Sequence, residues 1–186
     1  MITINSREVT ATVRKRELSS VHQEEINKDR FRVVPAAYLI LRRDDHVLLQ
    51  LRSNTGYRDG HWATGAAGHV EEGEPVHRAA CREAFEELGI EVEESNLEPL
   101  TTLHRTNRGA DRMDAGLDER VDFFFTTMHW KGKPRIMEPE KASKLNWFAL
   151  DALPEPVVPH ELQVLMALRA KLHNNGEVPP IMTHGW

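Results

Sequence analysis

Cysteine is almost absent from this sequence, and so are long apolar segments. The one cysteine among 186 residues, Cys81, excludes an internal disulfide and suits a reducing compartment. No apolar run approaches the roughly 20 residues that a membrane-spanning helix needs. The first residues also lack the apolar core of a signal peptide. We therefore expect a cytoplasmic protein that makes no membrane contact.

Excess positive charge is absent as well. The net charge is −5 at pH 7, so no general basic field attracts a nucleic-acid polymer, and we expect none as a partner. A protein of this charge that binds phosphate groups must use local arginine or lysine side chains, or a metal ion. Nothing in the composition suggests a protein that binds a polymer.

What is present is the composition of one ordinary globular domain. The chain is 40% apolar and 28% charged, and its length suffices for one domain with a core. Residues 1–32 are polar with mixed charge, and we interpret them as an N-terminal arm, which is compatible with a homodimer. Residues 33–175 form the predicted domain, and residues 176–186 are interpreted as a C-terminal tail.

The predicted domain combines strands with two helices. Two β-rich segments within 33–52 flank Asp44 and Asp45, a pattern typical of a hairpin. A loop rich in glycine and small residues follows over 53–68, and apolar periodicity predicts a helix over 159–173. Further strands are predicted at 90–93, 99–106, 120–130 and 144–149. This combination indicates an α/β layered domain.

The first helix carries an unusual concentration of acidic residues. Pro75 suits a first helical position and Gly89 a C-terminal cap, so the pattern predicts a helix over about 75–88. Glu83, Glu86 and Glu87 then project within one arc of that helix. Their charges repel one another, unless a hard divalent cation such as Mg²⁺ or Mn²⁺ lies among their oxygens. The structural alternative is a solvated acidic face with Arg82 paired to Glu86.

The residues around these glutamates resemble a known motif. Gly68, five residues, Glu74, seven residues and then Arg82-Glu83-Ala84-Phe85-Glu86-Glu87-Leu88-Gly89-Ile90 is similar to the Nudix box at every defined position. The likeness is tight over 68–90 and extends in weaker form over about 33–155. It implies the Nudix α/β/α sandwich with a mixed sheet, and Mg²⁺-dependent or Mn²⁺-dependent hydrolysis of a diphosphate linked to another moiety.

The resemblance also assigns roles within the box. It implies that Glu83, Glu86 and Glu87 ligate the metal together with the backbone carbonyl of Gly68. Glu83 is in addition the position credited with deprotonating the attacking water. Arg82 would orient the carboxylates, and Glu74 would brace the junction of loop and helix.

Outside the box the candidates are fewer and their structural alternatives stronger. Glu140 is the candidate for an additional ligand or base, ahead of Glu138; both also fit as surface acids near a proline turn. The candidates for substrate contact lie at the end of the first hairpin, at two aromatic positions and in or beside the loops at 53–61 and 107–119. They are Arg52, Tyr57, Arg58, Trp62, Arg105, Arg108 and Phe148. His69 and His77 lie near the box but are not expected to be ligands.

The segment "GAAGHVE" is also similar to the branch near isopentenyl-diphosphate isomerase. That isomerase needs a cysteine in the strand before the box, where this chain has Thr64, Gly65, Ala66 and Ala67, and Cys81 faces the core side of the helix. The isomerase is therefore disfavoured. A non-catalytic ligand sensor is a second alternative, which the intact box argues against.

The substrate is predicted by elimination. The markers associated with coenzyme A, with diadenosine polyphosphates and with ADP-ribose are absent or out of register. Nucleoside triphosphates remain, with oxidised ones as candidates, and hydrolysis would release a nucleoside monophosphate and pyrophosphate.

Overall fold

Asp44 and Asp45 form the turn of the predicted hairpin. In the computed structural model, which describes residues 31–106, 119–173 and 176–186, β1 (Val34–Arg43) and β2 (His46–Arg52) pair antiparallel on either side of it. Asp44 takes a positive φ of 54°, which aspartate tolerates better than most residues. The hairpin is thus confirmed. Residues 33–186 form one compact unit, whereas the expected arm at 1–32 lies almost wholly outside the described residues.

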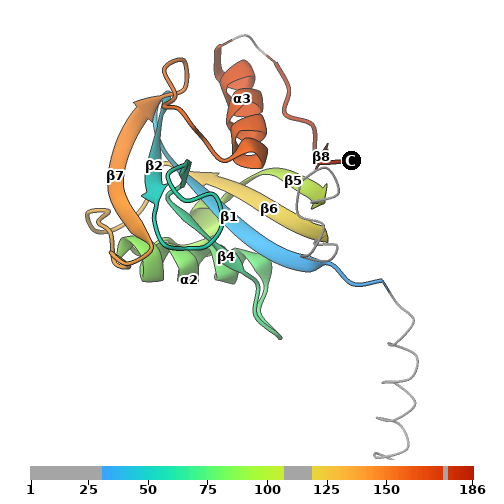
Figure 1. Ribbon diagram of the computed structural model, residues 1–186, viewed down its shortest axis with the longest axis horizontal. Helices are drawn as coiled ribbons and strands as arrows, with labels where there is room; N and C mark the ends of the chain where they lie inside the picture. Colours follow the sequence, from blue (N-terminus) through green and yellow to red (C-terminus); the bar gives the residue numbers. More distant parts are fainter. Residues whose placement is uncertain (1–30, 107–118, 174–175) are drawn as a thin grey trace, which may run out of the picture. The chain divides into compact units, whose positions relative to one another are not determined.

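A mixed sheet forms the centre of the molecule (Figure 1). Within the described parts of the chain it has eight strands, in the order β3-β2-β1-β6-β5-β8, with β4 pairing with β1 and β7 with β2. β1 runs parallel to β6, and β5 antiparallel to β6. The remaining strands are β3 (Trp62–Thr64), β4 (Ala66–His69), β5 (Glu98–Thr106), β6 (Glu119–Thr127), β7 (Ala142–Ala149) and β8 (Ile181–His184).

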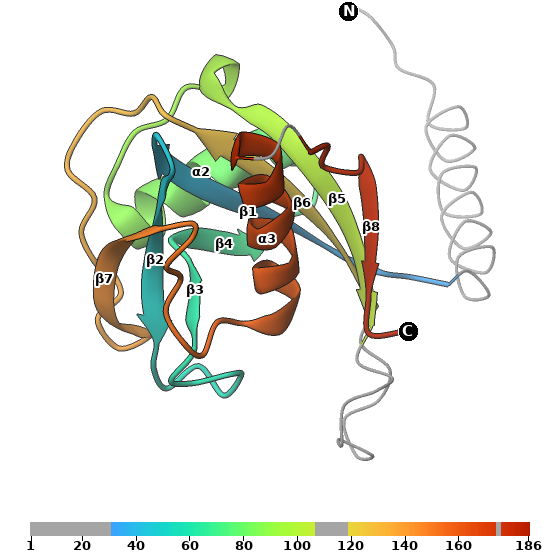
Figure 2. The ribbon, with the colours of Figure 1, turned by 90° about the horizontal axis from the view of Figure 1, so that it is seen from above.

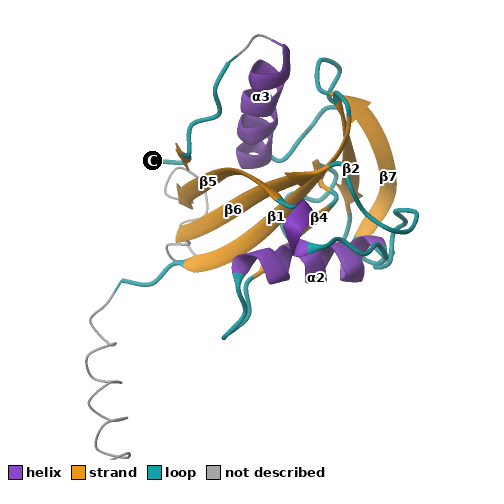
Figure 3. Ribbon diagram, turned by 180° about the vertical axis from the view of Figure 1, so that it is seen from behind, coloured by secondary structure: helices purple, strands orange, loops and turns teal. Residues whose placement is uncertain are grey.

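Two helices cover opposite faces of this sheet, which confirms the predicted α/β/α sandwich (Figure 1, Figure 3). Helix α2 (Val76–Leu88) packs on one face and α3 (Pro159–His173) on the other. Successive residues of β1 alternate between the two cores, with Tyr38 on the α3 side and Leu39 on the α2 side, as the period of a strand requires. A short 3₁₀ helix, η1 (Glu94–Asn96), follows α2.

Helix α2 has the ends that the sequence predicts, to within one residue. Pro75 is the N-cap rather than the first helical residue, and Gly89 caps the C-terminus with a φ of 65°. The Gly89 N–H donates to the Phe85 carbonyl at 2.9 Å, as a left-handed cap requires. The motif helix is therefore fixed by its own local sequence.

Three expectations of the fold were wrong. The predicted loop over 53–68 contains the short strands β3 and β4. The segment 90–93 forms only an isolated bridge between Glu91 and Lys131. The expected tail at 176–186 contains β8, which pairs parallel with β5 and lies at the opposite side of the sheet from β7 (Figure 2).

Within the described residues, no helix is both long and apolar enough to cross a membrane.

Candidate active site

Arg82 is the centre of the acidic cluster on α2. Its guanidinium donates two hydrogen bonds to Glu74, both at 3.0 Å, one to Glu83 at 2.7 Å and one to Glu86 at 3.0 Å. A further bond at 3.0 Å reaches the carbonyl of His69. These bonds raise the pKa of Arg82, those to Glu74 most of all, and lower that of Glu74. One arginine therefore ties the loop before α2 to two carboxylates of the helix.

Glu83 lies against the end of β4. A Cβ atom built on Gly68 would overlap the carboxylate of Glu83, so position 68 has no room for a side chain. Burial raises the pKa of Glu83, and the bond from Arg82 opposes this rise. The glycine of the motif is thus required here by the close approach of a carboxylate to the backbone.

Glu87 points away from Arg82, toward the start of β4 and toward β2. Its Oε2 atom accepts a hydrogen bond from the Ala67 N–H at 2.9 Å and lies 3.5 Å from the Gln50 amide nitrogen. Burial raises its pKa to about 8, with smaller contributions from Glu83 and Glu138. The carboxylates of α2 are thus shared between the arginine and the sheet.

The donor set of this cluster fits a hard divalent ion. Glu83, Glu86 and Glu87 supply oxygen atoms, which Mg²⁺ and Mn²⁺ prefer, and Gly68, without a side chain, lets the Glu83 carboxylate approach its backbone. In residues 31–106, 119–173 and 176–186, however, no three acidic, histidine or cysteine side chains gather as a ready-made metal cluster. The bonds of Arg82 hold Glu83 and Glu86 toward the arginine, whereas Glu87 lies toward the sheet.

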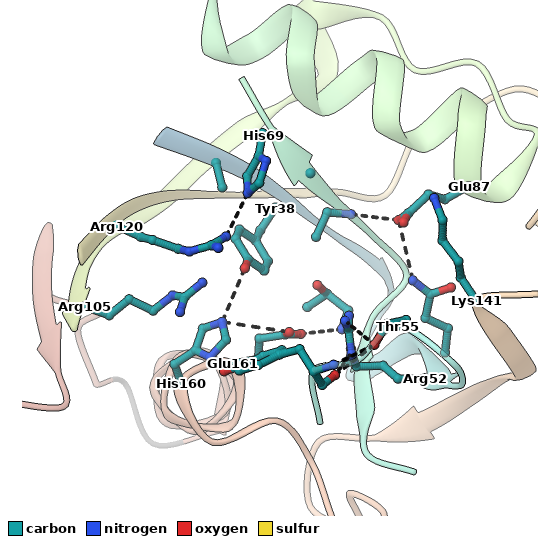
Figure 4. Close-up of a pocket in the computed structure, with 17 residues that line it drawn as sticks. Tyr38, Arg52, Thr55, His69, Glu87, Arg105, Arg120, Lys141, His160 and Glu161 are labelled. Atoms are coloured by element: carbon teal, nitrogen blue, oxygen red, sulfur yellow. Dashed lines mark hydrogen bonds and ion pairs between the residues drawn. The ribbon is translucent and has the colours of Figure 1, made fainter. Parts of the chain in front are cut away.

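A cavity of about 510 Å³ adjoins the cluster, and both Gly68 and Glu87 line it. Four cationic side chains line it too, Arg105 and Arg120 on one side and Arg52 and Lys141 on the other (Figure 4). This local positive charge contrasts with the net negative charge of the chain. It provides the arginine and lysine side chains that phosphate binding by an acidic protein requires.

The far end of the cavity, beside α3, is built from buried polar groups. The Tyr38 hydroxyl lies 3.3 Å from His160 Nε2, and Glu161 accepts a hydrogen bond at 2.5 Å from the Thr64 N–H. Arg105 donates to the buried carboxylate of Asp122 at 2.5 Å. This end of the cavity therefore presents both donors and acceptors at close range (Figure 4).

Burial determines the charge of these groups. Loss of hydration lowers the pKa of His160 well below its usual value, with the charge of Arg105 as the next contribution. It raises the pKa of Glu161 to about 7 and keeps the Tyr38 phenol protonated by raising its pKa. His160 is thus neutral at neutral pH, and its Nε2 atom lies 3.9 Å from Asp122 and 4.0 Å from Glu161.

Several residues selected from the sequence lie at this cavity and others do not. Arg52, Tyr57 and Arg105 line it, and Arg52 also donates to the Tyr57 carbonyl at 2.9 Å, which holds the loop. Arg58 is not among the lining residues. Arg108 and the loop at 107–118 lie outside the described residues.

The two aromatic candidates belong to the core instead. Trp62 is only 9% exposed, and its ring meets that of Phe148 edge-on at 4.7 Å. Neither lines the cavity, so the expected base-stacking role is not supported at either position. Aromatic strand residues of this kind pack between the sheet and a helix, and the sequence alone does not show whether such a ring faces the core or the cavity.

Glu140 also lies apart from the cavity lining. Its side chain is exposed, and its backbone carbonyl accepts a hydrogen bond from Asn54 at 3.3 Å. Glu138 does not line the cavity either, but it follows Met137, whose N–H donates to the Glu87 carbonyl at 3.0 Å. The charge of Glu138 also contributes to the raised pKa values of Glu83 and Glu87. These two observations favour Glu138 over Glu140 as the further acid.

The cavity residues that were not selected from the sequence include Arg120, Lys141, His160 and Glu161. His69, which was not expected to be a ligand, also lines the cavity, 2.8 Å from Arg120, while His77 packs on Phe125. The one available signal was the pair His160-Glu161 at the start of an otherwise apolar helix face. Polar residues on the buried face of a helix are uncommon without a partner.

Comparisons with known proteins agree with the fold. The family model described as the NUDIX domain matches residues 31–168. The NAD-capped RNA hydrolase NudC of Escherichia coli (strain SMS-3-5 / SECEC) is 30% identical over 122 residues, which are 66% of this chain and 41% of that protein. The NudC of Edwardsiella ictaluri is 40% identical over 70 residues, 38% of this chain and 25% of that protein. The chain thus spans less than half the length of these curated relatives.

Solved structures extend the comparison. A MutT NUDIX hydrolase from Burkholderia pseudomallei is 30% identical with a TM-score of 0.64, covering 73% of this chain and 98% of that one. The NUDIX domain of Shewanella oneidensis NrtR, solved with ADP ribose, is 22% identical with a TM-score of 0.60, covering 78% and 92%; it supports the fold alone. The match to the family model over most of the chain establishes that the protein belongs to the Nudix hydrolase family, whose members act on phosphoric anhydride bonds.

Proposed function

We propose that this protein is a divalent-metal-dependent pyrophosphohydrolase of nucleoside triphosphates, normal or oxidised, which releases a nucleoside monophosphate and pyrophosphate. The observation that carries the proposal is the cavity that joins Gly68 and Glu87 to four cationic side chains. Its volume of about 510 Å³ is typical of sites for small organic ligands. A polyanionic substrate would thus meet both cations and the acidic cluster within one site.

Within the cluster, Glu83, Glu86, Glu87 and the carbonyl of Gly68 would hold Mg²⁺ or Mn²⁺, with Glu138 or Glu140 as a further acid. When bound, the ion neutralises phosphate charge and makes a water molecule more acidic. Glu83, whose pKa is raised by burial, would accept the proton of the attacking water, an effect of roughly 10²–10⁴ in rate. Arg82 holds Glu83 and Glu86 in place through its hydrogen bonds.

The remainder of the cavity suits a nucleotide. Arg52, Arg105, Arg120 and Lys141 line it and would attract the charges of a triphosphate. The polar end beside α3, with the Tyr38 hydroxyl and the neutral ring of His160, offers hydrogen-bond partners to a base. Hydrogen bonds of this kind discriminate strongly between bases, because the buried polar atoms of the protein lose their partners when a base lacks the matching atoms.

A second candidate is the pyrophosphate bond of a dinucleotide such as NAD. The observation that favours it is the likeness to proteins named NAD-capped RNA hydrolases, at 30% identity. The net charge predicts that no nucleic acid is a partner. The likeness to NAD-capped RNA hydrolases means that this prediction must be tested by experiment. NAD and NAD-capped RNA therefore belong in the substrate panel.

The test is hydrolysis by the purified protein with Mg²⁺ and with Mn²⁺, measured as phosphate and pyrophosphate released from the triphosphates and as monophosphate products separated from the diphosphate-linked compounds. The panel contains normal and oxidised nucleoside triphosphates, NAD, NAD-capped RNA, ADP-ribose, dinucleotide polyphosphates, nucleotide sugars and coenzyme A. Metal-dependent turnover of a triphosphate, lost in Glu86→Gln and kept in Glu72→Gln, is the expected result. Faster turnover of NAD or capped RNA would replace the proposed substrate.

Metal binding has a readout that needs no substrate. Thermal unfolding with and without Mn²⁺ should show stabilisation of the wild-type protein, because a ligand that binds only the folded state raises the melting temperature. Glu86→Gln should reduce that stabilisation. A folded protein that binds Mn²⁺ but turns over no member of the panel would favour the non-catalytic sensor.

A further inference from the structure

We propose that strand β8 supports the wall of the substrate site, and that His184 is a positioning residue that sets the place of His160 in that wall. This inference rests on the proposed function and deepens it. The segment was expected to be a tail, and the structure instead places it beside two residues that line the cavity.

Backbone pairing fixes β8 to the sheet independently of its side chains. The strand runs parallel to β5, and His184 is the register partner of Arg105. The Thr102 N–H donates to the Pro180 carbonyl at 3.0 Å, and the Thr101 hydroxyl donates to the Pro179 carbonyl at 2.7 Å. The main chain of β8 is therefore held before the ring of His184 is considered.

Helix α3 then fixes the ring of His184. The Gln163 amide donates to the Thr183 carbonyl at 3.1 Å, and its oxygen lies 2.8 Å from His184 Nδ1. Because that oxygen only accepts, Nδ1 must carry the proton of this bond. Gln163 stands three residues after His160, so both project from neighbouring positions of the same helix. One residue thus links the strand to the helix that carries the cavity histidine.

The ring of His184 lies next to that of His160. The two ring centroids are 6.2 Å apart with the planes at 60°, and His160 Nε2 lies 3.3 Å from the Tyr38 hydroxyl. The ring of His160 therefore has Tyr38 and His184 as neighbours. Removal of the His184 ring takes away one of these two neighbours and gives His160 freedom to turn from its place in the cavity wall.

Other contacts attach the segment around β8 to the domain. Trp186 stacks edge-on against His104 at 4.9 Å, and Gly185 adopts a φ of +80° against the Thr106 carbonyl, with no room for a Cβ. These contacts, like the backbone pairing, do not involve the His184 side chain. Substitution of His184 therefore separates positioning of the cavity from attachment of the strand.

The first test is steady-state kinetics of His184→Ala with the triphosphate that the wild-type protein hydrolyses best. The expected result is a KM raised about fivefold, the factor that one net hydrogen bond contributes, with kcat changed less than about twofold. His184→Asn, which keeps a donor near the place of Nδ1, should restore part of the loss. The matched control is Ile181→Ala, on the same strand with a side chain 69% exposed, and it should behave as wild type.

The second test needs no substrate and separates this inference from the proposed function. Nitrogen-15 NMR of the histidine rings reports the surroundings and tautomer of His160 in the wild-type protein, in His184→Ala and in Ile181→Ala. We expect the His160 signals to shift in the first variant only. If His184→Ala does not fold, Gln163→Leu, which removes the same anchor, replaces it. Unchanged His160 signals and an unchanged KM in a folded variant would overturn the proposal.

Discussion

The carboxylate of Glu83 packs on the backbone of Gly68 so closely that a methyl group there would overlap it. Gly68→Ala should therefore displace Glu83 while leaving the other carboxylates in place. If Glu83 accepts the proton of the attacking water, kcat should fall by roughly 10²–10⁴. The measurement is kcat of the purified variant with Mg²⁺ and the best substrate.

Glu72→Ala is the control for this substitution, because Glu72 is an exposed residue of the turn that follows β4. Its kinetic constants should equal those of the wild type. A Gly68→Ala variant with full activity would show that the approach of Glu83 to position 68 has no part in the reaction.

Arg82 binds three glutamates and one carbonyl, and its removal leaves those carboxylates to repel one another. Arg82→Ala should lower the free energy of unfolding by about 1–2 kcal/mol and lower kcat/KM, since Glu83 and Glu86 lose their orientation. Urea unfolding without metal and kinetics with Mg²⁺ measure the two effects. Arg82→Lys should restore little, because lysine lacks the planar fork.

Arg78 is the matched control on the same helix. It makes one exposed ion pair with Glu94 at 3.6 Å, and pairs of this kind contribute about 0–1 kcal/mol. Arg78→Ala should keep both stability and activity. Equal losses in the two variants would mean that Arg82 acts only through general charge.

The part of the site that could be predicted from the sequence is the part built from local contacts. Helix α2 is determined by Pro75, by its apolar periodicity and by Gly89, and the relation of Gly68 to Glu83 spans only 15 positions of one motif. Short-range rules of capping and helix geometry suffice for such features. The motif therefore located the acidic cluster and its arginine.

The substrate side of the site could not be predicted in the same way. His160 reaches Tyr38 across 122 residues, and β8 joins the sheet beside a strand almost 80 positions earlier. Trp62 and Phe148 were expected in the site because aromatic rings stack on bases, yet they bury each other. Pairings at such separations depend on the assembled sheet, which periodicity within one segment does not describe.

Glu138 and Glu140 can be distinguished by substitution. Glu138 contributes to the raised pKa values of Glu83 and Glu87 and binds Lys141, a cavity residue, at 2.8 Å. We expect Glu138→Gln to lower kcat/KM by about 10–100-fold, the range for residues that support a metal site. Glu140→Gln should change it less than about twofold. The opposite order, measured at saturating Mg²⁺, would restore the preference for Glu140 that the sequence suggested.

Substitutions of Tyr57 and Phe148 should have different effects, the first on substrate binding and the second on stability. Tyr57 lines the cavity and is 41% exposed, so Tyr57→Leu should raise KM about five- to tenfold, as loss of stacking on a base does, and leave stability unchanged. Phe148 packs on Trp62 in the core, so Phe148→Leu should cost about 1 kcal/mol of stability with KM unchanged. Kinetics and urea unfolding of both variants test the contrast, which a raised KM in Phe148→Leu would contradict.

Glu161 should give the protein a distinct dependence of stability on pH. Burial raises its pKa from 4.5 to about 7 in the folded state. Between these values the folded protein keeps a proton that the unfolded chain has released. Stability therefore decreases as pH rises through this window and is constant above it. The decrease attributable to Glu161 is on the order of 3 kcal/mol.

Glu161→Gln isolates this contribution, because glutamine can still accept the hydrogen bond from the Thr64 N–H and does not titrate. His160 acts in the opposite direction: its lowered pKa makes stability decrease as pH falls below its usual value, in both proteins alike. Urea unfolding of the two proteins at pH 5, 6, 7 and 8 therefore gives the difference directly. Relative to the wild type, Glu161→Gln should become progressively more stable from pH 5 to pH 7 and then remain so. Parallel stability curves would mean that Glu161 is ionised in the folded protein throughout this range.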